Sequence, residues 1–143
     1  MAREFKFYLY FKKVIPPDEV LNSPIFIKKI ARLPFLPPSF NIFYQIFLPF
    51  RYFIDGLSVM FFPGYMLPFL FLGKSIVVLT NDVYYEAHRG GLPFQYRLSY
   101  GLFSWWAAKR ATLIMTISEF AKTEIADFFK ISPRRVFINP WGL

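Results

Sequence analysis

The fold of this chain is decided by the stretch ATLIMTISEFAKTEI, residues 111–125. Its first part, residues 112–117, is apolar and rich in β-branched side chains, which favours a β-strand. Ser118 comes next, and serine is a preferred helix N-cap because its hydroxyl oxygen accepts a free backbone N–H. A helix to about Lys130 should follow, with inward side chains at helical spacing: Ala121, Ile125 and Phe128. The stretch predicts a strand that leads directly into a helix.

Further strands are predicted on both sides of this stretch. The run SIVVLT at residues 75–80 is continuously apolar and β-branched, which indicates a strand buried on both faces, as in parallel sheets. Shorter apolar runs predict three more strands: residues 5–11, 57–62 and 136–138. Residues 25–33 are ambiguous, because the spacing of Ile25, Ile27 and Ile30 does not decide between the strand and the helix period.

Two more helices complete the pattern. Asn41 is expected to cap a helix to about Phe53, and residues 95–110 form the other. The expected inward side chains are Phe43, Ile46, Phe47 and Phe50 in the first, and Leu98, Leu102 and Trp105 in the second. Rigid or glycine-rich loops are expected at residues 34–39 and 90–91. Because strands alternate with helices, the predicted class is α/β, a mostly parallel sheet with helices on both faces.

The amino-acid composition limits the classes of function that this chain can have. The 143 residues suit one domain, and 55% are hydrophobic, enough for a core. With no cysteine and one histidine, His88, the chain has no disulfide, thiolate metal site or multi-histidine metal cluster. The net charge is +8, but the basic residues form scattered pairs, which argues against nucleic-acid binding. A basic surface with many aromatics fits an anionic membrane surface or a phosphorylated ligand.

Two uncharged stretches raise the question of a membrane span, residues 33–50 and 56–73. Both contain several prolines, which remove backbone donors that lipid cannot replace. We therefore expect strands and loops of a buried core, with spanning helices as the alternative. The start, MAREFKFYLYFKK, has no small-residue cleavage site. The expected location is cytoplasmic, with peripheral attachment to the inner face of the membrane left open.

Polar or flexible residues follow three of the predicted strands. These are Pro63-Gly64-Tyr65, then Asn81-Asp82, then Ser118-Glu119. In a parallel sheet the carboxyl ends of the strands share one edge, and ligands bind there. Each group also has a purely structural interpretation, as a turn, as a partner for nearby backbone, or as a helix cap. Asp82 with Glu86 is a candidate acid–base pair, although nothing in the sequence shows that the two face each other. His88, in the predicted loop HRGG, is expected to be solvated rather than catalytic.

The order of these motifs resembles a known family. The series FFPGYMLP, SIVVLTNDVYYE, AAKRATLIMTISEFAKTEI and VFINPWGL is similar to the N-terminal domain of family-four glycosyltransferases with the GT-B fold. The resemblance implies a Rossmann-like domain that holds the acceptor, while a separate C-terminal domain holds a nucleotide-sugar donor. It implies transfer of a glycosyl group to a hydroxyl, most members retaining the anomeric configuration without a metal.

The resemblance also implies roles for residues at the predicted edge. Asp82 and Asn81 would be catalytic, although the family often has His where this chain has Asn81. The acceptor would be bound by Gly64, Tyr65, Tyr85, Glu86, Ser118 and Glu119. The expected partners are a glycan or lipid-linked acceptor, the donor domain and an anionic membrane surface, but no nucleic acid. No cofactor is expected in this chain; the intact enzyme would use a nucleotide-sugar donor.

Relative to that family, residues 1–143 correspond to a single incomplete domain. The family's first strand with its glycine-rich loop, and the whole donor domain, have no counterpart in the chain. We therefore expect a fragment of a hexosyltransferase for polysaccharide or glycolipid synthesis, inactive alone. The alternatives are a non-enzymatic, membrane-associated interaction module and an inactive fragment.

Overall fold

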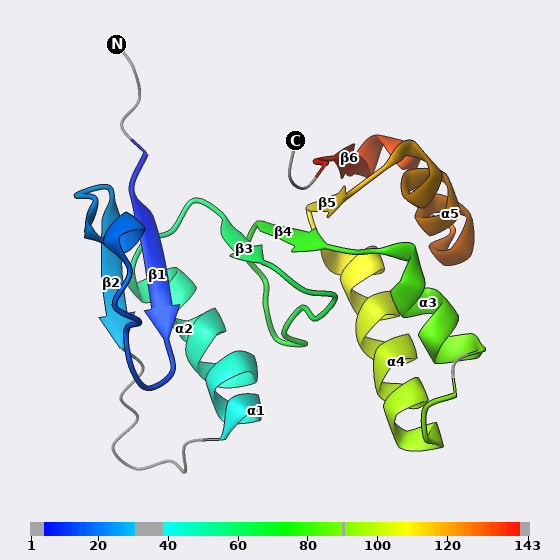
Figure 1. The fold of residues 1–143 in the computed structure, drawn as a ribbon, viewed down its shortest axis with the longest axis horizontal. Helices are drawn as coiled ribbons and strands as arrows, with labels where there is room; N and C mark the ends of the chain where they lie inside the picture. The colour runs from blue at the N-terminus through cyan, green and yellow to red at the C-terminus, as the bar shows by residue number, and fades with distance from the viewer. Residues whose placement is uncertain (1–4, 31–38, 90, 141–143) are drawn as a thin grey trace.

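The computed structural model describes residues 5–30, 39–89 and 91–140. Its strands form two sheets, a parallel pair of order β1–β2 and a four-stranded parallel sheet of order β3-β4-β5-β6 (Figure 1). The predicted α/β class with a parallel sheet is confirmed. The elements are β1 (Phe7–Phe11), η1 (Glu19–Asn22), β2 (Phe26–Ile30), α1 (Phe40–Ile42), η2 (Phe43–Phe47), α2 (Leu48–Ile54), β3 (Met60–Phe62), β4 (Ser75–Val78), α3 (Asn81–His88), α4 (Phe94–Arg110), β5 (Leu113–Thr116), α5 (Glu119–Phe129), η3 (Pro133–Arg135) and β6 (Val136–Ile138).

The core lies on one face of the four-stranded sheet. A single row across it, in register, is almost completely buried: Phe62, Val77, Ile114 and Val136. Small and branched side chains of α4 and α5 complete the same hydrophobic cluster, among them Ala107, Ala108, Ala121 and Ile125. Successive side chains of a strand point to opposite faces of the sheet. This buried row therefore determines which side chains of each strand face the core.

The opposite face of the same sheet is less covered. Phe61 of β3 is 52% exposed and Phe137 of β6 is 53% exposed. Between them, Ile76, Leu113 and Met115 are only half-buried. The continuous apolar character of β4 predicts burial on both faces, and in β4 itself the neighbouring Val77 and Val78 are both buried. The exposure of the opposite face is greatest at β3 and β6, the two edge strands of the sheet.

The segment of residues 40–54 is helical, but its predicted cap is wrong. Its predicted inward face is right for Phe43 and Phe47, which pack against the core, and wrong for Ile46 and Phe50, which are exposed. The side chain of Ser39, not Asn41, caps it: its hydroxyl oxygen accepts the Ile42 N–H at 3.3 Å. Residues Phe43–Phe47 form a π-helical turn, which holds one extra residue and rotates everything after it. As a result Leu48 is buried where the regular period predicts Phe50, which is 64% exposed.

α4 is confirmed as a helix, but it packs through a different face from the predicted one. Its buried residues are Ser104, Ala107 and Ala108. The predicted inward stripe of Leu98, Leu102 and Trp105 is about half exposed. Small side chains let α4 approach the sheet closely, so here the larger apolar side chains are the outward ones.

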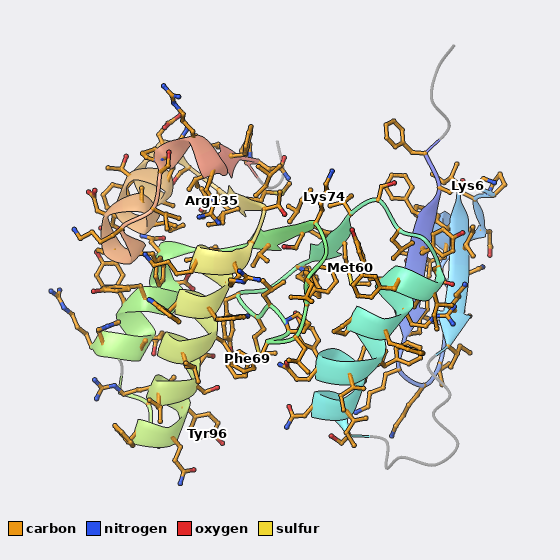
Figure 2. All side chains as sticks on the ribbon, turned by 180° about the vertical axis from the view of Figure 1, so that it is seen from behind. Lys6, Met60, Phe69, Lys74, Tyr96 and Arg135 are labelled. Atoms are coloured by element: carbon orange, nitrogen blue, oxygen red, sulfur yellow. The ribbon has the colours of Figure 1, made fainter. Side chains whose placement is uncertain are left out.

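The loop of residues 63–74 fills the space between α4 and the helical segment of residues 40–54. Phe69 packs against Phe103 and Trp106 of α4 in tilted arrangements, with ring centroids 5.1 and 5.6 Å away. Its backbone N–H donates to Gln45 Oε1 at 2.9 Å. Figure 2 shows Phe69 between the two helical regions. This loop therefore joins the two halves of the molecule.

A polar cluster around Asp55 fixes the β1–β2 pair to the end of α2. Asp55 accepts hydrogen bonds from the Lys29 ammonium, from Tyr10 Oη at 2.5 Å and from the Arg51 guanidinium at 2.6 and 2.9 Å. Burial raises the pKa of Asp55, but the hydrogen bonds from Lys29, Tyr10 and Arg51 outweigh it and hold the pKa below its usual value. Burial, with the hydrogen bond to Asp55, raises the pKa of Tyr10 well above its usual range.

The remaining predictions for this part of the chain have mixed outcomes. Residues 25–33, ambiguous in sequence, contain β2 as far as Ile30. The predicted loop of residues 34–39 lies outside the described residues, except for Ser39. Among residues 5–30, 39–89 and 91–140, no helix is both long and apolar enough to cross a membrane.

Candidate functional site

The carboxyl ends of the strands meet at one edge of the sheet. β3, β4 and β5 are neighbours and run in the same direction, so the residues that follow them emerge together. Backbone hydrogen bonds extend the pairing to this edge: Leu79 N–H donates to Met115 O at 3.0 Å and Asn139 N–H donates to Thr116 O at 2.7 Å. The structure thus has the edge at which parallel sheets bind ligands.

The residues after β4 begin a helix that the sequence analysis missed. α3 runs from Asn81 to His88, so Asn81 and Asp82 lie in its first turn rather than in a turn of the loop. The predicted loop character of His88 is wrong for the same reason, although its side chain is exposed as expected. The helix propensity of NDVYYEAH is low, because the segment has few strong helix formers. The stability of α3 therefore comes from its tertiary contacts.

Three side chains form a polar cluster between α3 and α5. Glu124 of α5 accepts two hydrogen bonds from α3: one carboxylate oxygen accepts from Asn81 Nδ2 at 2.7 Å and the other from Tyr85 Oη at 2.6 Å. The hydrogen bond to the Glu124 carboxylate, with burial, raises the pKa of Tyr85. Two of the predicted site residues, Asn81 and Tyr85, are therefore held together by a third group.

Glu124 could not be selected from the sequence. It is one of three acids on α5, with Glu119 and Asp127, and local sequence does not distinguish it from them. Its role follows only from the packing of α3 against α5. No short motif encodes a contact between residues that are 43 positions apart.

Asp82 is exposed at the start of α3. Its carboxylate makes no hydrogen bond or ion pair with any residue in the described part of the chain. Glu86 is one helical turn further on and is also exposed, so the two carboxylates lie on one side of α3. The purely structural interpretation of Asp82, as an acceptor for nearby backbone donors, has no support among these contacts.

Ser118 caps α5 as predicted. Its hydroxyl oxygen accepts the Ala121 N–H at 3.1 Å. Glu119 is exposed in the first turn of α5, where its negative charge faces the positive end of the helix dipole. The Ser118 hydroxyl can still donate a hydrogen bond to a ligand, because a hydroxyl is both donor and acceptor.

Gly64 and Tyr65 belong to a different environment. Tyr65 stacks on Tyr100 of α4, with ring centroids 4.9 Å apart, and burial with the neighbouring Tyr100 raises its pKa. A side chain at Gly64 would meet no atom within 4 Å, so this position does not require glycine. Among the described hydrogen bonds and ring contacts, none links Tyr65 to Asn81, Tyr85 or Ser118.

The arrangement offers hydrogen-bonding groups without a metal site. In the described ranges no group of three or more His, Asp or Glu side chains could hold a metal ion. What the edge presents is an exposed carboxylate, Asp82, beside an amide, Asn81, that is already oriented by Glu124. Such groups suit a polyhydroxylated ligand, which offers many donors and acceptors. Comparison with protein-family models, curated proteins and solved structures found no significant match to this chain.

Proposed function

We propose that this chain is the acceptor-side part of a glycosyltransferase that uses a nucleotide-sugar donor. In the reaction, an acceptor hydroxyl oxygen bonds to the anomeric carbon of the donor sugar. The bond from that carbon to the nucleoside diphosphate breaks, the nucleotide leaves with the electron pair, and the hydroxyl proton passes to a base. The carboxyl edge of the sheet would hold the acceptor.

One observation carries the proposal, the free carboxylate of Asp82 at this edge. It is exposed and has no partner among the described residues, while the neighbouring Asn81 is held by Glu124. A carboxylate in that position can accept hydrogen bonds from sugar hydroxyls and hold one of them for reaction. Such positioning contributes several kcal/mol to catalysis, because the orientation is fixed before the reaction. Gly64 and Tyr65 are the weakest members of the proposed acceptor site, since their contacts are with α4.

We propose further that the domain is completed by a segment outside these residues. β1 and β3 each have one edge that pairs with no strand in the described part of the chain. Neither strand carries a charge or a proline, the usual protection of a free edge. The half-exposed face with Phe61 and Phe137 also needs a covering element. A strand between β1 and β3, followed by a helix, would satisfy both.

The second candidate function is a non-enzymatic interaction module. The exposed sheet face favours it, because large exposed apolar surfaces commonly mark binding sites for other proteins. The two functions differ at Asp82, which the interaction module does not need.

The test compares Asp82→Asn with the wild-type sequence in a protein extended past Leu143 by a donor-binding domain. We expect no transfer by the 143-residue chain alone. In the extended protein, Asp82→Asn should lower kcat/KM at least about tenfold, or about 1.4 kcal/mol, with the melting temperature unchanged. Asp127→Asn, at an exposed acid of α5, is the matched control and should keep full activity. Wild-type turnover by a folded Asp82→Asn protein would remove Asp82 from the site.

A further inference from the structure

An apolar groove lies between α3, α4 and α5, and none of the three side chains of the polar cluster lines it. Its volume is about 500 Å³. The larger side chains that line it include Tyr84, Phe94, Leu98, Leu102, Trp105 and Phe128. No acidic residue lines it, and its polar side chains include His88 and Arg97.

The α4 wall of the groove is a single stripe on the helix. Phe94, Leu98, Leu102 and Trp105 are spaced by four, four and three residues, which places them on one side of an α-helix. They are exposed by 74, 59, 49 and 49%, respectively. An exposed stripe of Phe, Leu and Trp is typical of helices that lie in a membrane interface rather than across the bilayer.

The charged residues of α4, the helix that carries this stripe, are all positive. α4 carries Arg97, Lys109 and Arg110 and no acid. Arg97 also fixes the groove, because its guanidinium donates to Ala87 O at 3.2 Å and to His88 O at 2.8 Å at the end of α3. Arg89, just beyond α3, is exposed. This combination of cations with an apolar stripe complements an anionic lipid surface.

The groove adjoins the polar cluster at the carboxyl edge. Phe128 stacks on Tyr84, with ring centroids 3.9 Å apart, and also contacts Tyr85 edge-on at 5.4 Å. Tyr84 lines the groove, while Tyr85 donates to Glu124. A lipid surface seated on the groove would therefore lie next to the proposed acceptor site.

We propose that the groove and the α4 stripe dock this protein on an anionic lipid bilayer. The stripe inserts into the headgroup region, and Arg89 and Arg97 contact the lipid phosphates. Docking is independent of sugar transfer, so it can be correct if the proposed enzymatic function fails. If both are correct, docking brings the protein to acceptors that are carried in the membrane.

The first experiment measures co-sedimentation of the 143-residue chain with phosphatidylglycerol–phosphatidylcholine vesicles and with pure phosphatidylcholine vesicles. We expect binding to the anionic vesicles only, weakened by salt. The double variant Leu98→Asp/Leu102→Asp should bind at least about tenfold less, because it replaces two exposed leucines of the inserting stripe with charges. The matched control is Leu70→Asp/Leu72→Asp, which changes two leucines that are 74 and 75% exposed in the loop of residues 63–74. Equal loss in both double variants, or no binding of the wild-type chain, would overturn the proposal.

A second measurement does not depend on the folding of the Asp variants. The sequence has no cysteine, so Leu102→Cys and Leu72→Cys each provide one labelling site for a polarity-sensitive fluorophore. Anionic vesicles should shift the emission of the label at position 102 to the blue and leave the label at position 72 unchanged. A shift only at position 72, or at neither position, would contradict docking through α4.

Discussion

The two ends of this chain differ in how completely they are packed. From β4 to β6, each inner strand has a partner on both sides, and α5 has a cap at each end, Ser118 and the left-handed Lys130. In contrast, β1 and β2 form an isolated pair that is attached to α2 through Asp55. Where the chain contains both partners of each strand contact, short stretches of sequence are enough to predict the structure. Where a strand partner is missing, polar contacts hold the element in place instead.

The largest effect is expected from the well-packed end. Ile125→Ala removes a side chain of α5 that is completely buried against the sheet. It should lower the free energy of unfolding by about 3 kcal/mol, through lost burial and the cavity that remains. Chemical denaturation measures this change. Leu72→Ala, at a position that is 75% exposed, should change the free energy of unfolding by less than about 0.5 kcal/mol. Equal losses of stability in the Ile125→Ala and Leu72→Ala proteins would refute the difference in packing.

The next effect tests the attachment of the β1–β2 pair. Asp55→Asn removes the charge that accepts from Lys29, Tyr10 and Arg51, and should cost about 2 kcal/mol. Hydrogen exchange should accelerate in β1 and β2 and stay unchanged in β4 and β5. Uniform acceleration in all four strands would show instead that the two ends unfold as one unit.

The same cluster predicts an acid sensitivity. Because the folded pKa of Asp55 is below its unfolded value, its contribution is fully present above about pH 4 and is lost as the pH falls through the folded pKa. Exchange in β1 and β2 should therefore rise on acidification, relative to β4. The Asp55→Asn protein should lack that part of the pH dependence, and an identical pH profile in both proteins would contradict it.

The smallest effect concerns the start of α5. Ser118→Ala removes the side-chain acceptor of the Ala121 N–H and should cost about 1 kcal/mol. Ser58→Ala, at an exposed position between α2 and β3, is the control and should be neutral. A thermal melt of each variant compares the two changes, and equal melting temperatures would mean that the cap contributes nothing.

Apart from α3, the sequence predicts the strands and helices of residues 75–140 well, because their signals are local. TLIMTI, the Ser118 cap and the helix behind it all appear in the structure within a few residues of the predicted positions. The features that the sequence does not predict depend on contacts between residues far apart in the chain, or on a change in the helical period. α3 is stabilised by its neighbours, and the π turn at Phe43–Phe47 rotates the later side chains.

The candidate site also has features that the sequence predicts and features that it does not. The shared edge follows from parallel strand order, which the alternation of strands and helices predicts. Glu124 and the packing of Tyr65 on Tyr100 do not follow, because both depend on how helices meet after the chain has folded. The outward stripe of α4 was missed because the small residues, and not the large ones, face the sheet.

The central claim is that the carboxyl edge around Asp82 binds the sugar acceptor. Saturation-transfer NMR with the methyl glycosides of glucose, galactose and mannose tests it directly in the 143-residue chain, at low protein concentration. The wild-type chain should transfer saturation to at least one glycoside, Asp82→Asn should lose most of that signal, and Asp127→Asn should keep it. Equal transfer in the Asp82→Asn protein, or no transfer from the wild-type chain, would contradict the claim.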